Sequence, residues 1–221
     1  MIKSPIVRKL FKGAENMKNF MKGLALISFL GAFLAPSFAQ VEIKEYEGKA
    51  LSPYDRQYDN SIKGPQTVDV KTYKLLIDGK IQHPQSLSYN EIVKLQSVER
   101  AITLHCIEGW SEYLLFKGVR LVDLLKKANP NKEVRTVIFY AADGYSSSLD
   151  YKFVIEKDIL LAYEINGLKL DSERGFPLQV VAESKYGYKW VKWVTHIELS
   201  DKTYVGYWEK RGYDNEANIS K

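Results

Sequence analysis

The stretch AITLHCIEGW, residues 101–110, indicates how the chain folds, because an alternating β-like run breaks here into a Gly-Trp turn. This pattern predicts a strand over residues 101–105 that delivers Cys106 to a loop. Cys106 is the only cysteine among the 221 residues. A lone cysteine is most often a buried small apolar residue, but a position at the end of a strand favours a side chain that is presented to a site.

The first 39 residues have the pattern of an export segment. Lys18 and Lys22 precede the uncharged run GLALISFLGAFLAPSFA, and Ser37 and Ala39 are small residues three and one positions before an expected cleavage site. The run is short for a membrane span, which needs about 20 apolar residues. We therefore expect a signal peptide over 1–39 and a periplasmic protein, with an uncleaved N-terminal membrane anchor as the alternative.

The charge of the chain lies largely in that segment. Six of the 32 basic and one of the 27 acidic residues lie in the first 39, so the remaining 182 residues carry 26 of each sign. The remainder is formally neutral, which gives no support for a nucleic-acid partner. Its length fits one domain with a single core, and we expect a monomer.

Cysteine and histidine usage restricts the metal chemistry. One cysteine allows no internal disulfide, no Cys-x-x-Cys-His haem attachment and no iron–sulfur cluster. An unliganded thiol would be oxidised outside the cytoplasm, whereas a soft metal would protect it as a thiolate. The histidines His83, His105 and His196 are scattered, and neighbouring strand residues such as His105 and Cys106 face opposite ways. A zinc site and a Cys-His protease dyad are therefore disfavoured.

Strand patterns dominate the rest of the chain. Runs rich in β-branched or aromatic residues predict strands at 73–79, 101–105, 134–141, 176–182 and 189–199, the last alternating Trp193, Thr195, Ile197 and Leu199 on one face. Asn166-Gly167 between two apolar runs predicts a hairpin. Short helices are expected after Ser88, which has Glu91 at capping-box spacing, and over 118–128, where Asn129-Pro130 ends the helix.

These elements predict an α+β fold with mixed or antiparallel β-sheet layers and short inserted helices. Residues 40–70 are polar and irregular, which predicts an extended N-terminal arm. We expect one domain over 71–205 and a C-terminal tail over 206–221.

Positive charge gathers in one segment, ERGFPLQVVAESKYGYKWVKW, residues 173–193. It contains Arg174, Lys185, Lys189 and Lys192 among aromatic residues and glycines. Lysines of this kind can be solvated residues on an edge strand. The alternative is a loop that grips a phosphate and a flat ring system.

Three segments in order, TLHCIEGW, FYAADGYSSSL and ERGFPLQVVAESKYGYKWVKWV, resemble the molybdopterin-binding domain of the sulfite oxidase family. The likeness runs from Asn60 to Leu199. It implies the sulfite oxidase molybdopterin-domain fold, and it implies molybdenum-molybdopterin in its mononucleotide-free form as the cofactor. Haem and iron–sulfur centres are not expected in this chain.

The resemblance also implies roles for particular residues. Cys106 matches the thiolate ligand of molybdenum, and Tyr145 matches the active-site tyrosine of sulfite oxidases. Lys189 and Lys192 match basic positions that hold the phosphate and pterin of the cofactor. The asparagine of the N-terminal arm that contacts the pterin is matched by Asn60, and Arg174 stands where relatives carry a His or Asn that touches the cofactor.

The sequence departs from the sulfite oxidase pattern at positions that bear on the predicted substrate. Sulfite oxidases follow the ligand cysteine with a Gly-Asn-Arg type sequence, but here Glu108-Gly109-Trp110 stands instead, and Gln179 replaces an arginine. These features favour similarity to the compact periplasmic subfamily that contains the protein-methionine-sulfoxide reductase catalytic subunit. The sequence also has only Arg8-Lys9 in place of a full twin-arginine export motif.

We therefore expect a periplasmic molybdenum oxidoreductase that transfers an oxygen atom to or from a small or protein-bound S- or N-oxide. Its electrons would be exchanged with a separate protein, which we expect to be a haem-bearing membrane subunit. Two alternatives stay open at this point: a periplasmic binding module that kept the fold without the cofactor, and a sulfite-oxidising enzyme.

Overall fold

The computed structural model describes residues 40–55 and 60–219, and the expected signal peptide over 1–39 lies outside the described residues. From Gln40 onward the chain forms one compact unit. The N-terminal arm, the central sheets and the C-terminal residues are therefore parts of one body.

The strands and helices of that body have the following bounds. The strands are β1 (Glu45–Tyr46), β2 (Lys49–Ala50), β3 (Lys74–Gly79), β4 (Gln85–Ser88), β5 (Ser97–His105), β6 (Ser111–Arg120), β7 (Thr136–Ala141), β8 (Ser146–Asp150), β9 (Leu160–Ile165), β10 (Leu168–Lys169), β11 (Gln179–Val181) and β12 (Val194–Ser200). The α-helices are α2 (Tyr89–Ile92), α3 (Leu121–Ala128) and α4 (Tyr151–Glu156), and the 3₁₀ helices are η1 (Gly187–Lys189) and η2 (Glu209–Arg211).

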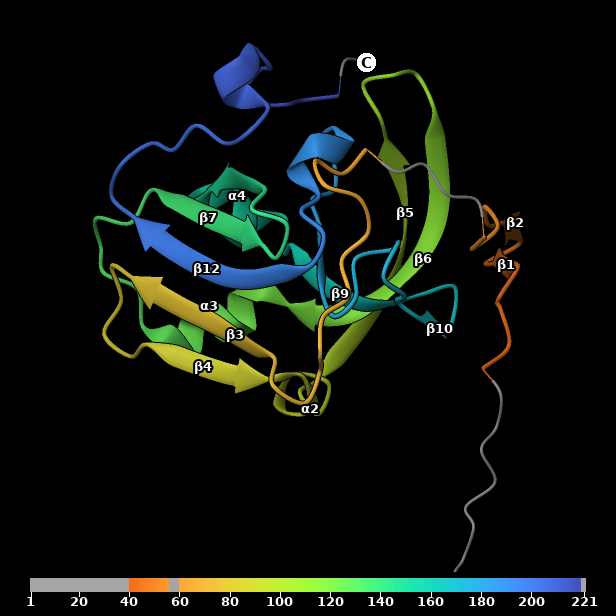
Figure 1. Ribbon diagram of the computed structural model, residues 1–221, viewed down its shortest axis with the longest axis horizontal. Helices are drawn as coiled ribbons and strands as arrows, with labels where there is room; N and C mark the ends of the chain where they lie inside the picture. Colours follow the sequence, from red (N-terminus) through yellow and green to blue (C-terminus); the bar gives the residue numbers. More distant parts are fainter. Residues whose placement is uncertain (1–39, 56–59, 220–221) are drawn as a thin grey trace, which may run out of the picture. The chain divides into compact units, whose positions relative to one another are not determined.

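Two five-stranded sheets contain all but the two shortest N-terminal strands, β1 and β2, of the described chain (Figure 1). The first has the order β4-β3-β12-β7-β8, in which β12 runs parallel to β3 and the other neighbours are antiparallel. The second has the antiparallel order β10-β9-β6-β5, with β11 also paired to β9. The predicted α+β class, with mixed and antiparallel sheets and short helices, is confirmed.

Both sheets and α3 contribute to one hydrophobic core. Phe116 of β6 and Phe139 of β7 are fully buried in the same cluster. Leu121, Leu124 and Leu125 lie on the buried face of α3 and join that cluster, as the helical spacing predicted. The helix begins at Leu121 and not at Gly118, because residues 118–120 pair with β9 as the end of β6. The core thus ties the two sheets together and fixes the loops at their ends.

The predictions that rest on short sequence motifs are confirmed. The Ser88 hydroxyl accepts from the Glu91 backbone amide at 3.3 Å, and the Glu91 carboxylate accepts from the Ser88 amide at 2.8 Å, which completes the capping box. Asn129 takes a left-handed conformation, with φ of 51°, where α3 ends. Asn166 and Gly167, both with positive φ, turn β9 into β10 as the hairpin signal predicted.

The strand predicted over 189–199 begins later than expected. Trp193 has a φ of 51° and lies before β12, and the register of β12 shifts after Val194. Of the predicted face, Ile197 and Leu199 are buried side by side in β12, whereas Thr195 is only partly buried and Trp193, although buried, lies before the strand. A left-handed residue followed by a bulge reverses the alternation that a straight strand would show.

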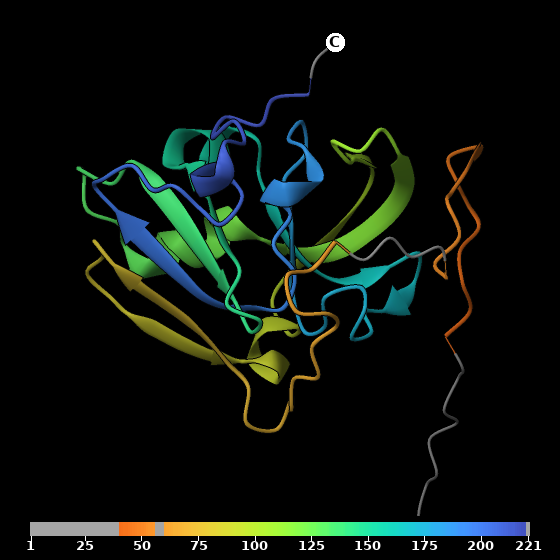
Figure 2. The same cartoon turned by 45° about the horizontal axis from the view of Figure 1, so that its top comes forward.

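The C-terminal residues return over the end of the molecule that also carries η1, as Figures 1 and 2 both show. An isolated antiparallel bridge joins Lys185 to Asn218 and confirms the contact. Residues 206–219 are thus held against the loop that precedes β12.

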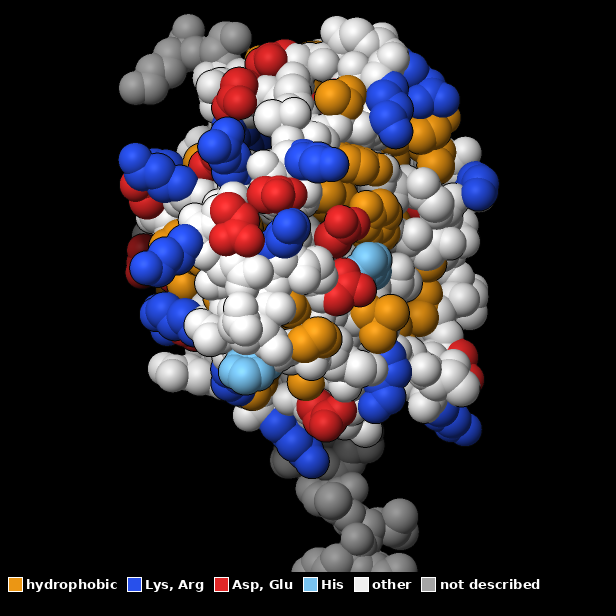
Figure 3. All heavy atoms as spheres, turned by 90° about the vertical axis from the view of Figure 1, so that its left-hand side faces the viewer, with side chains coloured by type: hydrophobic (Ala, Val, Ile, Leu, Met, Phe, Trp, Pro, Cys, Tyr) orange, Lys and Arg blue, Asp and Glu red, His pale blue; other side chains and the backbone are white. Residues whose placement is uncertain are grey.

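Charges of both signs are mixed on one face of the molecule (Figure 3). On the face shown in Figure 3, Lys and Arg side chains are interspersed with Asp and Glu side chains. Among the residues that the structure describes, no helix is long and apolar enough to cross a membrane.

Tyr73, which directly precedes β3, is hydrogen-bonded to β12, and we expect loss of this bond to weaken the fold. Its buried hydroxyl donates to the Val194 carbonyl oxygen at 2.6 Å. The Tyr73→Phe substitution should lower the free energy of unfolding by about 1 kcal/mol, because the carbonyl loses its partner. Urea denaturation at neutral pH measures this difference.

The same residue predicts a pH dependence. Burial raises the pKa of Tyr73 above its ordinary value of about 10. The folded state therefore keeps a proton that the unfolded state loses, so its contribution to stability is complete below about pH 10 and declines as the pH rises further. Urea titrations between about pH 8 and pH 11 should show a shallower decline in Tyr73→Phe than in the wild type. Equal slopes would contradict this assignment.

Candidate functional site

A tight hairpin between β5 and β6 presents Cys106. The two strands pair from Ser97 opposite Val119 to His105 opposite Ser111. Beyond that last pair, the Cys106 amide donates to the Trp110 carbonyl at 2.9 Å, and the Gly109 amide donates to the Cys106 carbonyl at 3.1 Å. Gly109 has a φ of 93°, which a residue with a side chain rarely adopts.

The N-terminal arm meets this hairpin at the thiol. Asn60 Nδ2 lies 3.5 Å from Cys106 Sγ and donates to Glu108 Oε2 at 3.1 Å. Trp110 Nε1 also donates to Glu108 Oε2, at 3.3 Å. Partial burial raises the pKa of the Cys106 thiol, and the nearby Glu108 carboxylate acts in the same direction. A cation at the sulfur would reverse this preference for the neutral thiol.

Cys106 lies in the wall of a cavity of about 380 Å³. The cavity is bounded by the N-terminal arm, the β5–β6 hairpin, the β7–β8 turn, the loop before β12 and the C-terminal residues. Its lining residues are Asn60, Ser61, Leu104, Cys106, Ile107, Glu108, Trp110, Asp143, Tyr145, Gln179, Gly187, Tyr188, Trp190, Lys192, Trp193, Trp208 and Tyr213. Segments far apart in sequence thus meet around one thiol.

The loop before β12 supplies indoles and an ammonium group to the cavity. Trp190 Nε1 donates to the Lys185 carbonyl at 2.9 Å, and Trp193 Nε1 donates to the Ser172 carbonyl at 2.7 Å. Lys192 Nζ donates to the Glu173 carbonyl at 2.8 Å and lies 5.4 Å from the centre of the Trp193 ring. The two indoles are therefore fixed by backbone acceptors, which keeps their rings in place as cavity walls.

Tyr145 enters the cavity from the turn between β7 and β8. Its amide donates to Asp143 Oδ1 at 2.8 Å, and its hydroxyl donates to the Tyr188 carbonyl at 2.5 Å. Burial raises the pKa of Tyr145, and the carboxylates of Glu209 and Asp143 add to this effect. The phenol is thus held neutral, as a hydrogen-bond donor.

Two of the basic residues expected at the cofactor are directed elsewhere. Arg174 is 7% exposed, and its guanidinium contacts Glu112 at 2.9 Å and the Tyr54 carbonyl at 2.7 Å. Lys189 is 1% exposed and contacts Glu209 at 2.6 Å. Neither residue lines the cavity. The structure brings four of the expected site residues together: Cys106, Asn60, Tyr145 and Lys192.

Several cavity residues were not singled out from the sequence. Trp208 and Tyr213 come from residues that were predicted to be a tail, although the run YVGYWEKRGY is rich in aromatic residues. Asp143 was identified only as part of a turn, yet it is 2% exposed and lines the cavity. Aromatic enrichment was the signal available for the first two.

The residues present fit a molybdenum-pterin group. The cavity volume lies in the range of roughly 300–1,000 Å³ typical of small-molecule sites. One wall offers the soft thiol of Cys106, which suits a thiophilic metal. Flat indoles and the Lys192 ammonium suit a ring system and an anionic group. Of the lysines expected at the cofactor, Lys192 is the one that lines the cavity.

Comparison with known proteins agrees with this geometry. A family model described as the oxidoreductase molybdopterin binding domain matches residues 62–208. An uncharacterized oxidoreductase of Bacillus subtilis is 33% identical over 150 residues, which are 67% of this chain and 76% of that protein. A protein-methionine-sulfoxide reductase catalytic subunit of Xanthomonas axonopodis is 30% identical over 156 residues, 63% of this chain. The chain spans about half of that reductase subunit, 48% of its length.

A solved structure shares the fold. The crystal structure of the sulfane dehydrogenase SoxCD from Paracoccus pantotrophus matches with a TM-score of 0.60 and 23% identity, over 63% of this chain and 41% of that chain. The family model covers well over half of the residues and includes the hairpin, the β7–β8 turn and the loop before β12. This chain therefore belongs to the oxidoreductase molybdopterin-binding domain family, that of the sulfite oxidases.

Proposed function

We propose that the protein is a periplasmic mononuclear molybdenum oxidoreductase that transfers an oxygen atom to or from an S- or N-oxide. The observation that carries this proposal is the Cys106 thiol in the wall of a cavity of about 380 Å³, with the Asn60 amide 3.5 Å from the sulfur. When bound, the cofactor supplies two-electron oxygen-atom transfer. The family model and the reductase relative support this class of chemistry.

The chain's own residues have separate tasks in this proposal. Cys106 holds the metal, and Asn60 orients the thiolate through its amide group. Lys192 holds the anionic part of the cofactor, and the indoles of Trp190 and Trp193 enclose its ring system. Tyr145, kept neutral by burial, lines the cavity with its hydroxyl fixed on the Tyr188 carbonyl, so that its ring orients the substrate.

The charges of the cavity favour a neutral substrate over sulfite. Among the described lining residues, Glu108 and Asp143 are acidic and Lys192 is basic. Gln179, which stands where relatives have an arginine, is 4% exposed and adds no charge. Without an arginine at position 179 the described lining residues offer sulfite no guanidinium partner, whereas a sulfoxide carries no net charge and needs none. Reduction of a sulfoxide takes up two electrons and two protons and releases the sulfide and water.

Electron supply requires a second protein in this proposal. The single cysteine leaves no ligand set for an iron–sulfur cluster, which supports an exchange of the two electrons with another chain. We propose a haem-bearing membrane subunit on the periplasmic side as that partner. The export pattern of residues 1–39 supports the periplasmic location.

Metal analysis tests the cofactor assignment. Protein purified from its native periplasm should contain about one molybdenum atom per chain by mass spectrometry, as a single metal-binding thiolate implies. A panel with reduced viologen should show turnover of methionine sulfoxide and other S- and N-oxides, and sulfite with ferricyanide should turn over more slowly. Absence of molybdenum from this material would refute the proposal.

A cofactor-free binding module is the second candidate, and the engagement of Lys189 and Arg174 by acidic partners favours it. In such a module Cys106 would be a partly exposed free thiol. Iodoacetamide should then alkylate the native protein at Cys106, whereas a metal-bound thiolate should resist alkylation until the metal is removed. Mass spectrometry of the alkylated peptide distinguishes the two functions.

A substitution at Asn60 tests the metal site without altering the Cys106 thiol. We expect Asn60→Ala to weaken molybdenum retention by about 10- to 100-fold, the effect typical of losing a contact to a metal ligand. Molybdenum per chain is measured before and after dialysis at neutral pH. Ser52→Ala is a matched control, because Ser52 fastens the same arm to Tyr113 but contacts no atom of Cys106. Equal retention in wild type and Asn60→Ala would contradict the role of Asn60.

A further inference from the structure

The C-terminal segment, which we define as residues 204–219, builds one wall of the cavity. Trp208 and Tyr213 line the cavity, and their ring centres are 5.2 Å apart. Tyr213 also meets the ring of Tyr188 edge-on at 5.2 Å. The family model ends at residue 208, so most of this wall lies beyond the matched region.

A buried ion pair fixes the segment next to Trp208. Glu209 Oε1 lies 2.6 Å from Lys189 Nζ, and the two side chains are 1% and 0% exposed. The Ser147 hydroxyl donates to the same carboxylate oxygen at 2.5 Å. Trp208 is the residue that immediately precedes Glu209. The position of its backbone is thus set by a charge pair that water does not reach.

The donor capacity of Lys189 is filled by this arrangement. An ammonium group has three N–H donors and no acceptor. Lys189 Nζ contacts Glu209 Oε1 at 2.6 Å, the Ser148 carbonyl at 3.0 Å and Asn215 Oδ1 at 3.2 Å. Two of these three partners belong to the C-terminal segment. To bind a cofactor phosphate, Lys189 would have to leave the buried Glu209 carboxylate without its cation.

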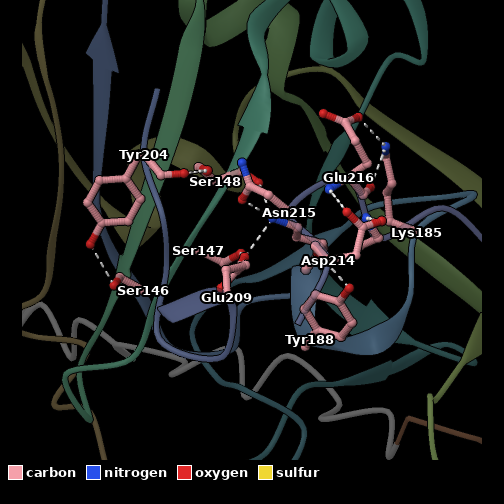
Figure 4. A network of polar contacts seen from close by, with 12 residues as sticks. Ser146, Ser147, Ser148, Lys185, Tyr188, Tyr204, Glu209, Asp214, Asn215 and Glu216 are labelled. Carbon is pink, nitrogen blue, oxygen red and sulfur yellow. Dashed lines mark hydrogen bonds and ion pairs between the residues drawn. The ribbon is translucent and has the colours of Figure 1, made fainter. Parts of the chain in front are cut away.

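A second set of contacts holds the far end of the segment (Figure 4). Lys185 Nζ donates to the Glu216 carbonyl at 2.7 Å and to Asn218 Oδ1 at 2.8 Å. Tyr188 donates from its hydroxyl to the Asp214 carbonyl at 2.7 Å. The loop before β12 therefore holds the segment through Lys185, which precedes η1, and through residues of η1 itself, while Lys192 of the same loop lines the cavity.

We propose that Lys189 and Glu209 form a latch that positions Trp208 and Tyr213 as the substrate-side wall of the cavity. Lys189 is then a positioning residue, and Lys192 alone of the two lysines contacts the cofactor. This inference rests on the proposed function for the identity of the substrate, an S- or N-oxide, but the latch itself is a property of the chain. The indole and phenol of the wall suit the sulfur and methyl groups of a methionine sulfoxide side chain.

The test compares Lys189→Met and Glu209→Gln with Lys192→Met. If the latch exists, both latch variants should be cleaved by trypsin after Lys210 or Arg211 faster than wild type, by about tenfold, because η2 opens more often. Trypsin digestion needs no bound metal, so it reports on the latch even if the proposed function fails. Both latch variants should also retain molybdenum at the wild-type level, whereas Lys192→Met should lose it.

Kinetics with two substrates distinguish the loss of a substrate-contacting wall from a general loss of structure. Both latch variants and Trp208→Ala should raise the KM for methionine sulfoxide by about tenfold with little change in kcat, the pattern of lost uniform binding. The KM for dimethyl sulfoxide, which is too small to need the wall, should change less. Loss of molybdenum in Lys189→Met but not in Glu209→Gln would overturn the proposal and make Lys189 a cofactor ligand. Unchanged trypsin cleavage in both latch variants would also overturn it.

Discussion

Replacing Cys106 by serine is expected to reduce the molybdenum content from about one atom per chain to near zero and to lower oxygen-atom transfer by more than about a hundredfold. The sulfur is the soft donor that the chain places in the cavity wall. A serine hydroxyl keeps its proton at neutral pH and is a harder donor, so it replaces the thiolate poorly. Metal analysis and viologen-coupled activity on the same preparation measure both effects.

Loss of molybdenum from Cys106→Ser can be distinguished from unfolding of this variant. Cys106 is only partly buried and lies in a turn, so the serine variant should unfold within about 1 kcal/mol of wild type in urea. Asn60→Ala provides a graded comparison, since it leaves the sulfur in place. A serine variant that keeps a full complement of molybdenum but loses activity would show that Cys106 serves as a reacting thiol and not as the metal ligand.

The second large effect is expected at the buried pair of Glu112 and Arg174. Their side chains are 2% and 9% exposed, and the guanidinium also donates to the Tyr54 carbonyl. Glu112→Ala leaves the buried cation without its carboxylate, so the free energy of unfolding should fall by about 3–5 kcal/mol. Because Arg174 also holds Tyr54 of the arm, the site near Asn60 should loosen in this variant. Urea denaturation at neutral pH measures the change.

A double variant is the control for the pair. Glu112→Met combined with Arg174→Met removes both charges and fills similar volume, so it should recover a large part of the stability lost in Glu112→Ala. If Arg174 instead served the cofactor directly, Glu112→Ala would leave stability nearly unchanged and the double variant would lose molybdenum. Metal content and urea midpoints together distinguish these results.

Fold class and several local elements could be predicted because their signals are local. The capping box at Ser88 and Glu91 and the hairpin at Asn166-Gly167 depend on residues within a few positions of each other. β6 was missed, although it is the longest strand of the described residues. Its sequence SEYLLFKGVR does not alternate cleanly, because its register against β9 shifts between Lys117 and Gly118.

A site residue could be predicted when its neighbours in the sequence determine its position in the fold. Cys106 and Tyr145 sit in turns that the sequence itself marks with glycine. For Lys189 and Arg174, the sequence indicates only that the side chains are positively charged. Their acidic partners, Glu209 and Glu112, are 20 and 62 residues away. Tertiary contacts of that kind decide whether a basic residue faces a ligand or closes a buried pair, and the linear pattern does not contain them.

The cavity takes residues from both ends of the described chain, with Asn60 on one side and Tyr213 on another. A ribosome releases the N-terminal part of a chain first, and domains fold as their residues emerge. The wall with Trp208 and Tyr213 is thus the last part of the cavity to leave the ribosome, after every other lining residue. A chain halted before residue 208 would lack this wall, and its cavity would be open on that side.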